Sequence, residues 1–255
     1  MDANGVDDGV SRSAVPAEPA KVATDKAGYL ARFVRKHGWQ IAIWFLCLLL
    51  PLWGFAALVG EIHEQEAFAF DAPILQWLHA RASPSLDRFF VLVSRIGFAW
   101  GTVPFDVFFI AWLAYRRRFR DGLFFALAVV GSLLLDVAGK AYFHRDRPDL
   151  WLSITPEYTY SFPSGHAMGS ATLGAALVFL CWNTRWRWPM AAAAIVFVLL
   201  VGLSRVYLGV HYPSDILAGW CAALAWVFGM FKLVDRKAPS PPTTAAPGGD
   251  KVGKA

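Results

Sequence analysis

The sequence predicts an all-α membrane protein built as a bundle of six transmembrane helices. The 255 residues are 56% hydrophobic with a mean hydropathy of +0.42, which is too apolar for an ordinary soluble domain. The apolar residues gather in stretches of about twenty, the length at which a helix crosses the hydrocarbon core of a bilayer. Lys and Arg residues stand beside these stretches, so the net charge of +5 reflects membrane topology rather than nucleic-acid binding.

Six apolar stretches are the predicted spans, and one of them, 98–115, carries Asp106 in its middle. In chain order they run near 39–60, 98–115, 121–142, 166–184, 188–207 and 214–233. The segment 71–96 mixes apolar and charged residues. It is predicted to form interfacial helices in the loop between the first two spans.

Loop charge gives the predicted orientation. Basic clusters precede the first span, join the second to the third and the fourth to the fifth, and follow the sixth. With six spans these clusters all lie on one side, which the positive-inside rule makes cytoplasmic. Both termini are then cytoplasmic, and the loops 61–97, 143–165 and 208–213 face outward. Short loops without an N-glycosylation sequon favour a bacterial inner membrane, with these loops in the periplasm.

The two ends of the chain differ in composition from the membrane domain predicted at 37–235. Residues 1–36 and 236–255 are expected to be disordered cytoplasmic tails, because they are rich in polar, Ala, Pro and Gly residues. The first 28 residues lack the apolar core of a cleavable signal peptide. The cysteines have no CxxC spacing and are expected to be small buried apolar side chains: Cys47, Cys181 and Cys221.

Polar and ionisable residues suited to catalysis or ligand binding gather at the outward ends of four predicted spans. The third span contains a lysine near its end and is followed by an arginine, the fourth begins at Ser-Gly-His, the fifth ends near an arginine, and the sixth begins beside a histidine and an aspartate. These residues are Lys140, Arg147, Ser164, Gly165, His166, Arg205, His211 and Asp215. Since the orientation comes from loop charge alone, their meeting on one side indicates a common site.

The cations in this set predict a phosphate ligand. Lys140, Arg147 and Arg205 come from separate segments. Charged residues in a membrane protein are energetically costly and usually have a function. Arginine donors fit phosphate oxygens in pairs, and lysine adds a point charge. Ser164 and Gly165 stand at the start of a helix, where free N–H groups and the helix dipole favour an anion.

The two histidines predict covalent catalysis. Asp215 follows His211 by four residues, so its carboxylate can hold one imidazole nitrogen and leave the other as a nucleophile. His166 can then act as the general acid toward the leaving oxygen. The cations supply the charge stabilisation, so no metal or other cofactor is expected.

Other ionisable residues have simpler interpretations. Three histidines are expected to be interfacial: His37, His63 and His79. His144 stands among arginines and is a candidate substrate contact. Asp136 precedes Lys140 by four residues, which predicts an ion pair along one helix face that holds Lys140 in place. Asp106 and Arg95 have no predicted partner.

Taken together, the motifs resemble the signature of a known family. They read Lys140-x6-Arg147-Pro148, then Pro163-Ser164-Gly165-His166, then Ser204-Arg205-x5-His211-x3-Asp215. In this order they are similar to the three-part signature of the type-2 phosphatidic acid phosphatases, whose superfamily also includes vanadium haloperoxidases and glucose-6-phosphatase. The resemblance covers about residues 71–233.

This resemblance implies a six-helix membrane core and metal-independent removal of phosphate from a lipid phosphate. His211 would form a phosphohistidine, Asp215 would orient it, and His166 would protonate the leaving group. The phosphoryl oxygens would be held by Lys140, Arg147, Ser164, Gly165 and Arg205. Arg145 lies outside the pattern and is assigned no more than a supporting role.

A substrate that reaches a rim site from the bilayer is expected to be a lipid with a phosphate headgroup. Candidates are undecaprenyl pyrophosphate, phosphatidylglycerophosphate, phosphatidic acid and lipid A phosphate, and the motifs read only the phosphate they share. Two alternatives stay open. The phosphoryl group can pass to a lipid or sugar hydroxyl instead of water, or the rim can be the phosphate site of a transporter. A transporter would need ionisable residues along a path through the spans. The sequence gives no oligomeric state.

Overall fold

A computed structural model describes residues 35–36, 38–39, 42, 44–63 and 68–234. The chain divides into two compact units, Met1–Phe45 and Leu46–Ala255, and the helices of the second unit carry the site. The tails predicted at 1–36 and 236–255 lie outside the described residues, apart from Arg35 and Lys36, which are helical.

All regular structure in the described part of the chain is helical, which confirms the predicted all-α class. In chain order, the elements are the π-helix η1 (Phe45–Leu49), α2 (Leu50–His63), α3 (Asp71–His79), α4 (Pro84–Ile96), α5 (Thr102–Tyr115), α6 (Phe119–Phe143), α7 (Gly165–Cys181), α8 (Arg187–Tyr207) and α9 (Pro213–Val234).

The predicted spans all contain helix, but their lengths differ from the prediction. Within the described residues, four stretches are long and apolar enough to cross a membrane: Phe45–Ile62, α6, α8 and α9. The other two predicted spans form shorter apolar helices, α5 with 14 residues and α7 with 17. At about 1.5 Å per residue, these two fall short of a hydrocarbon core of about 30 Å.

The segment 71–96 forms two short helices, α3 and α4, where interfacial helices were predicted. The side chain of Ser83 caps α4 by accepting a hydrogen bond from the Leu86 N–H at 3.4 Å, and Pro84 occupies the first turn. The Tyr207 hydroxyl at the end of α8 donates to Asp87 at 2.6 Å. This contact fixes α4 beside the end of α8 that carries Arg205.

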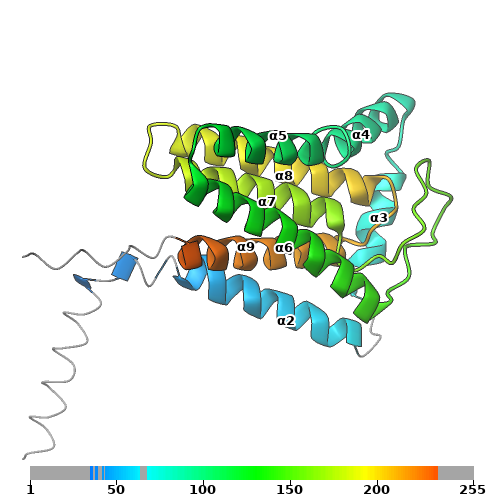
Figure 1. The fold of residues 1–255 in the computed structure, drawn as a ribbon. Coiled ribbons are helices and arrows are strands. Elements are labelled where there is room, and N and C mark those ends of the chain that lie inside the picture. Colours follow the sequence, from blue (N-terminus) through cyan, green and yellow to red (C-terminus); the bar gives the residue numbers. More distant parts are fainter. Residues whose placement is uncertain (1–34, 37, 40–41, 43, 64–67, 235–255) are drawn as a thin grey trace, which may run out of the picture. The chain divides into compact units, whose positions relative to one another are not determined.

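Helix α7 lies at the centre of the bundle and contacts α6, α8 and α9 (Figure 1). Small residues let its neighbours approach closely: a Cβ on Gly174 would lie 3.1 Å from the Cβ of Ala194 in α8. The Thr172 hydroxyl also donates to Ser132 of α6 at 2.8 Å, which joins two helices within the apolar part of the bundle.

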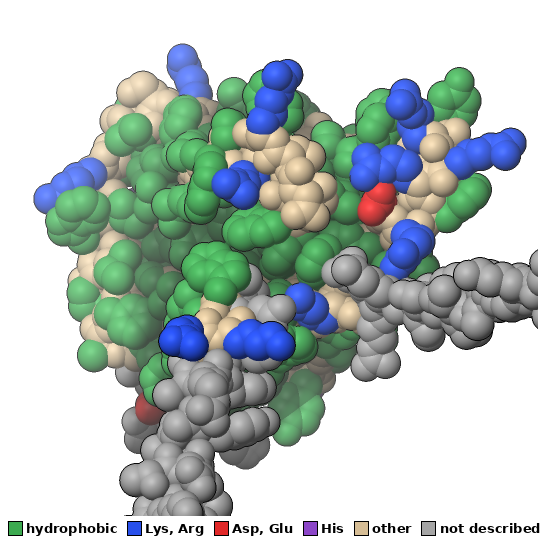
Figure 2. Space-filling view, turned by 90° about the vertical axis from the view of Figure 1, so that its left-hand side faces the viewer, with side chains coloured by type: hydrophobic (Ala, Val, Ile, Leu, Met, Phe, Trp, Pro, Cys, Tyr) green, Lys and Arg blue, Asp and Glu red, His purple; other side chains and the backbone are tan. Residues whose placement is uncertain are grey.

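The two ends of the bundle differ in their connecting segments and in their basic side chains. Helices α3 and α4 and the long loop between α6 and α7 lie at one end, while the α5–α6 and α7–α8 connections lie at the other (Figure 1). Lys and Arg side chains gather on the face formed by those two connections (Figure 2). Its exposed cations include Arg116, Arg117, Arg118, Arg120, Arg185 and Arg187. The predicted cytoplasmic clusters from these connections therefore share one end of the bundle.

The cysteines are less buried than the small buried side chains that the sequence predicts. Cys47, Cys181 and Cys221 are free thiols and only partly buried. The prediction was wrong because apolar side chains on the outside of a membrane bundle are covered by lipid rather than by protein.

Candidate active site

The three motifs meet at the end of the bundle opposite the basic connections. The loop after α6, the start of α7, the end of α8 and the start of α9 come together there (Figure 1). The Ser164 N–H donates to the Asp215 carbonyl at 3.3 Å, which joins the second motif to the third. The Arg147 guanidinium donates to the Val210 carbonyl at 2.7 Å, which joins the first motif to the third. Residues scattered over about eighty positions of the sequence thus form one cluster.

His211 is 1% exposed, and its two ring nitrogens face different groups. Nδ1 lies 3.5 Å from Asp215 Oδ2 and 3.3 Å from the Ser161 hydroxyl, whereas Nε2 lies 3.1 Å from Arg147 Nη1. Because arginine only donates, Nε2 accepts this hydrogen bond and the proton of the neutral ring is on Nδ1. Burial, together with the charges of Arg205 and Arg147, lowers the pKa of His211 to about 4, although Asp215 opposes the shift. The ring is therefore neutral at pH 7, with its lone pair on Nε2.

The Asp215 carboxylate is fully buried and is held on several sides. It accepts hydrogen bonds from Arg145, from the Ser161 hydroxyl and, at 2.9 Å, from the Tyr212 N–H. These donors fix the carboxylate that faces Nδ1 of His211. An oriented carboxylate of this kind holds the imidazole tautomer and stabilises positive charge on the ring.

Arg145, which the sequence placed outside the motif pattern, is a direct partner of Asp215. It also pairs with Asp71 at 3.0 Å and donates to the Ser214 hydroxyl at 2.8 Å. Asp71 in turn accepts from the Ser214 N–H at 2.9 Å and from its hydroxyl at 2.5 Å. The start of α3 is thereby tied to the start of α9 through buried polar groups.

Two arginines converge on one carboxylate beside His211. Arg205 is 2% exposed, and its Nη1 donates to Ser94 at 2.5 Å while Nη2 bonds Glu157. Arg147 Nη2 pairs with the same carboxylate at 2.8 Å. Glu157 Oε2 lies 3.9 Å from Nε2 of His211, so an anion occupies the place where the sequence predicts one. Glu157 lies in a loop outside the motifs, and no sequence pattern singles it out.

The pKa values of Glu157 and Arg147 follow from their burial and from the charges around them. Burial alone would raise the pKa of Glu157, but Arg205, His211 and Arg147 outweigh it, and the pKa lies below its ordinary value. Burial lowers the pKa of Arg147, and Glu157 opposes that shift. Both groups are charged at neutral pH.

Lys140 is held as predicted, because its Nζ lies 2.7 Å from both carboxylate oxygens of Asp136. The side chain of Ser164 caps α7 by accepting from the Ala167 N–H at 3.5 Å. A Cβ on Gly165 would lie 2.9 Å from Asp136 Oδ2, so only glycine fits between the helix start and this ion pair. The His166 ring packs against Phe98, with ring centroids 4.9 Å apart.

Histidines outside the motifs take up packing positions. His79 stacks on Trp151 with centroids 4.0 Å apart, and His144 is exposed and packs edge-on against Tyr160 at 4.6 Å. His37 and the side chain of His63 lie outside the described residues. Arg95, for which the sequence offered no partner, lies over the ring of Trp100 at 4.9 Å.

A cavity of about 440 Å³ opens between α5, α6 and α7. Its lining is mostly apolar and includes Phe98, Val103, Val130 and Leu133. It reaches Gly165 and Asp136, so it adjoins the start of α7. Asp106 also lines it, and one oxygen of this buried carboxyl has no hydrogen-bond partner among the described residues.

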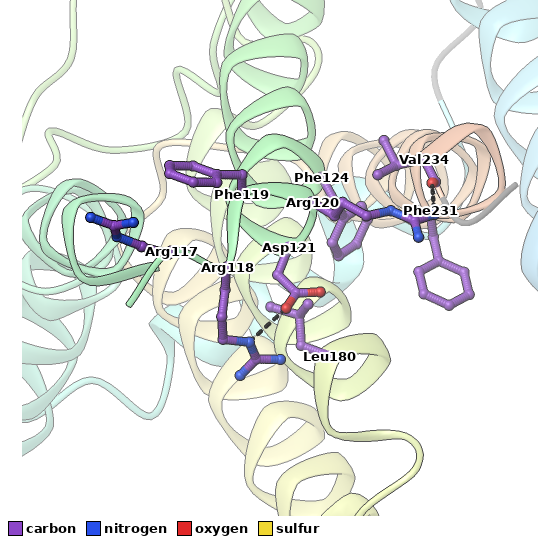
Figure 3. A pocket seen from close by; sticks show the side chains of 9 residues that line it. All are labelled: Arg117, Arg118, Phe119, Arg120, Asp121, Phe124, Leu180, Phe231 and Val234. Atoms are coloured by element: carbon purple, nitrogen blue, oxygen red, sulfur yellow. Dashed lines mark hydrogen bonds and ion pairs between the residues drawn. The ribbon is translucent and has the colours of Figure 1, made fainter. Parts of the chain in front are cut away.

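A second hollow of about 360 Å³ lies at the basic end of the bundle, and its cations do not converge (Figure 3). Arg118 pairs with Asp121 at 2.7 Å, and Arg120 donates to the Val234 carbonyl at 3.0 Å. Arg117 points away from both. This hollow therefore lacks the converging donors found beside His211.

Comparison with known proteins agrees with this geometry. The model of the PAP2 superfamily matches residues 121–239, which contain all three motifs. Phosphatidylglycerophosphatase B of Bacillus subtilis is 29% identical over 188 residues, which cover 72% of this chain and 92% of that protein. Undecaprenyl-diphosphatase of Sulfolobus acidocaldarius is 27% identical over 189 residues, covering 72% and 86%.

A solved structure extends the similarity to the fold. The crystal structure of the transmembrane PAP2-type phosphatidylglycerolphosphate phosphatase from Bacillus subtilis has a TM-score of 0.64 and 27% identity. The match covers 72% of this chain and 94% of that one. In its motifs, their meeting point and its helix arrangement, this chain is similar to the membrane proteins of the PAP2 superfamily, whose model matches residues 121–239.

Proposed function

We propose that this membrane lipid phosphatase of the PAP2 family acts through a phosphohistidine on His211. The observation that carries the proposal is the unprotonated Nε2 of a buried, neutral imidazole, 3.1 Å from Arg147 and beside an anion held by Arg147 and Arg205. A phosphoryl group bound by these guanidinium groups would have its phosphorus in front of Nε2.

In the first step, the lone pair on Nε2 of His211 forms a bond to phosphorus, and the bond from phosphorus to the lipid oxygen breaks. The leaving oxygen takes a proton from His166, which stands at the start of α7. The imidazole becomes positively charged as the N–P bond forms, and Asp215 stabilises that charge from the Nδ1 side. Arg147 and Arg205 stabilise the equatorial oxygens, with Lys140 and the N–H groups at Ser164 and Gly165 as further donors.

In the second step, a water molecule attacks the phosphohistidine, and the N–P bond breaks. His166, now deprotonated, takes a proton from the attacking water, and inorganic phosphate leaves. His211 and His166 thereby regain their starting protonation states. Every step uses side chains of this chain, so the proposal requires no metal ion.

The proposed substrate is a lipid that bears a phosphate monoester or pyrophosphate. The apolar cavity between α5, α6 and α7 adjoins Gly165 and supports a route for a hydrocarbon chain to the site. Relatives are named for phosphatidylglycerophosphate and for undecaprenyl diphosphate. We propose one of these two lipids, or phosphatidic acid, as the substrate of this chain.

The proposed site faces the exterior or the periplasm. Support comes from the basic connections at the opposite end of the bundle, which the positive-inside rule makes cytoplasmic (Figure 2). Water and the released phosphate would then exchange with the extracytoplasmic side.

The test is a phosphate-release assay on purified protein in detergent with undecaprenyl pyrophosphate, phosphatidylglycerophosphate, phosphatidic acid and lipid A phosphate. We expect release from at least one lipid, no release by His211→Ala, and full activity in the presence of a chelator. Loss of activity with EDTA that a divalent ion restores would contradict the mechanism. A phosphorylated acceptor in place of free phosphate would show transfer instead of hydrolysis.

A further inference from the structure

Glu157 occupies the position that the proposed mechanism assigns to the phosphoryl group. Its two carboxylate oxygens reach different arginines, Oε1 to Arg205 and Oε2 to Arg147 at 2.8 Å. The same Oε2 lies 3.9 Å from the nucleophilic nitrogen of His211. A substrate phosphate cannot contact both guanidinium groups while this carboxylate remains between them.

The carboxylate leaves one donor of the site unused. Nε of Arg205 is buried and has no hydrogen-bond partner among the described residues. A carboxylate offers two oxygens in one plane, whereas a phosphoryl group offers three oxygens around a tetrahedral phosphorus. A phosphoryl group can therefore reach this third N–H as well, and an arginine edge that presents two parallel donors suits such an anion.

Both arginines have supports that do not involve Glu157. Arg147 donates to the carbonyl and hydroxyl oxygens of Thr159 at 2.6 and 3.0 Å. Arg205 donates to Ser94 at 2.5 Å from the other side of its guanidinium group. The side chain of Glu157 is 30% exposed at the water-facing end of the site. Its carboxylate can therefore swing outward while both guanidinium groups stay in place.

We propose that Glu157 is an internal ligand of the phosphoryl site, which substrate phosphate must displace and which returns to expel inorganic phosphate. An anion that binds only after Glu157 has left has its apparent affinity reduced by the fraction of molecules in which the site is free. The same factor applies to substrate and to product phosphate. Glu157 therefore raises KM and weakens product inhibition, and it takes no part in bond breaking. The proposal rests on the proposed function to the extent that the ligand of Arg147 and Arg205 is a phosphoryl group.

The test compares Glu157→Gln with the wild type, using inhibition by orthophosphate and orthovanadate during lipid hydrolysis. Glutamine keeps the size of the side chain and removes the charge that holds it between the arginines. We expect the inhibition constant of orthophosphate to fall about tenfold, and KM to fall by a similar factor, with kcat changed much less. Asp149→Asn is the matched control, because it removes a negative charge from the same loop at an exposed position. Its inhibition constant should stay within about twofold of the wild-type value.

Two results would overturn the proposal. An unchanged or higher inhibition constant in Glu157→Gln would mean that Glu157 supports the arginines instead of competing for them. A large loss of kcat with an unchanged inhibition constant would mean that Glu157 takes part in the chemistry. If Glu157→Gln does not fold, Glu157→Asp replaces it. Its shorter carboxylate bridges the two arginines less well, so its inhibition constant should lie below that of the wild type.

Direct binding separates this proposal from the proposed function. Calorimetric titration of the full-length wild type and variants with orthovanadate measures occupancy of the site without any turnover. If the wild type hydrolysed none of the lipids, the proposed function would fail, and tighter vanadate binding by Glu157→Gln would still support the internal ligand. If hydrolysis proceeded and vanadate bound no more tightly to Glu157→Gln, only the internal ligand would fail.

Discussion

His211 combines two properties that an exposed histidine cannot hold together. Burial keeps the ring neutral, with its pKa at about 4, while Asp215 and Ser161 fix the side of the ring that carries the proton. The pKa shift raises the fraction of reactive imidazole, and the fixed tautomer aims its lone pair at the arginines. Each neighbour of the ring therefore has a separate, testable effect.

Replacing Asp215 should separate binding from turnover. Asp215→Asn keeps the size of the side chain but removes the charge that faces Nδ1, so the imidazole loses both its preferred tautomer and the partner of its developing positive charge. We expect kcat to fall by about three to four orders of magnitude while binding of orthovanadate, measured by calorimetry, persists. Asp71→Asn alters the same polar network without touching His211, and it should cost far less. Equal losses in the two variants would contradict the role given to Asp215.

The depressed pKa of His211 should appear in the pH dependence of stability. The unfolded chain, with an ordinary pKa of 6.5, binds more protons than the folded chain between about pH 4 and pH 6.5. Stability therefore rises with pH through this window and falls on acidification, by about 2 kcal/mol at pH 5 for this one group. Glu157, with its pKa held below the ordinary 4.5, loses its contribution only at lower pH.

The measurement is the Tm in detergent at pH 7 and at pH 5 for the wild type and for His211→Gln. The wild type should lose more of its Tm over this interval, because the variant has no imidazole to protonate on unfolding. Parallel losses in the two proteins would argue that His211 is not held neutral by the fold.

At the level of elements, the ends of three helices supply groups of the site. The start of α7 supplies a cap and free N–H groups, the end of α8 supplies Arg205, and the start of α9 supplies Asp215. The side chains of α3 and α4 complete the site from outside, through Asp71 to Arg145 and through Ser94 to Arg205. Helices α3 and α4 therefore hold Arg145 and Arg205 in position.

The close approach of α7 to α6 should make Gly165 intolerant of a side chain. In Gly165→Ala the new Cβ would lie 2.9 Å from Asp136 Oδ2 and 3.2 Å from its Cγ, so the helix start or the Asp136–Lys140 pair must shift. We expect kcat/KM to fall by about a hundredfold, since small displacements of reacting groups have effects of this size. Gly169→Ala, one turn along the same helix, places its Cβ in ordinary contact at 3.9 Å and should keep near wild-type activity. Comparable activity in both variants would mean that the start of α7 is not positioned this tightly.

At the level of the whole molecule, the exposed basic residues and the candidate active site lie at opposite ends of the bundle. The exposed cations of the α5–α6 and α7–α8 connections gather on one face (Figure 2), and the motifs gather at the other end (Figure 1). This asymmetry supports the proposed membrane orientation, which can be checked without any assay of activity.

The orientation can be tested with a maleimide that does not cross membranes. In a background with Cys47, Cys181 and Cys221 replaced by alanine, Asp149→Cys should react in intact cells because its loop lies at the outward end. Arg117→Cys, in the α5–α6 connection, should react only after the membrane is permeabilised. Labelling of both positions under the same condition would place the two ends on one side and contradict the proposed topology.

The sequence by itself determined the class of the protein and most of the motif chemistry, because these depend on local order. Apolar stretches and loop charge predict spans and sides, and the Asp136–Lys140 ion pair follows from a four-residue spacing along one helix. The pairing of His211 with Asp215 has the same spacing across the start of α9. Helix geometry fixes the Asp136–Lys140 contact within α6, whereas His211 lies just before α9 begins at Pro213.

Only the tertiary structure decided which groups outside the motifs complete the site. Arg145 reaches Asp71, 74 positions away, and Glu157 reaches Arg205, 48 positions away. These contacts depend on the path of the 144–164 loop and on the position of α3. No periodic pattern in the sequence reveals either of them. Burial is likewise a property of the assembled helices, and it is burial that makes His211 neutral and leaves Nε of Arg205 in need of an acceptor.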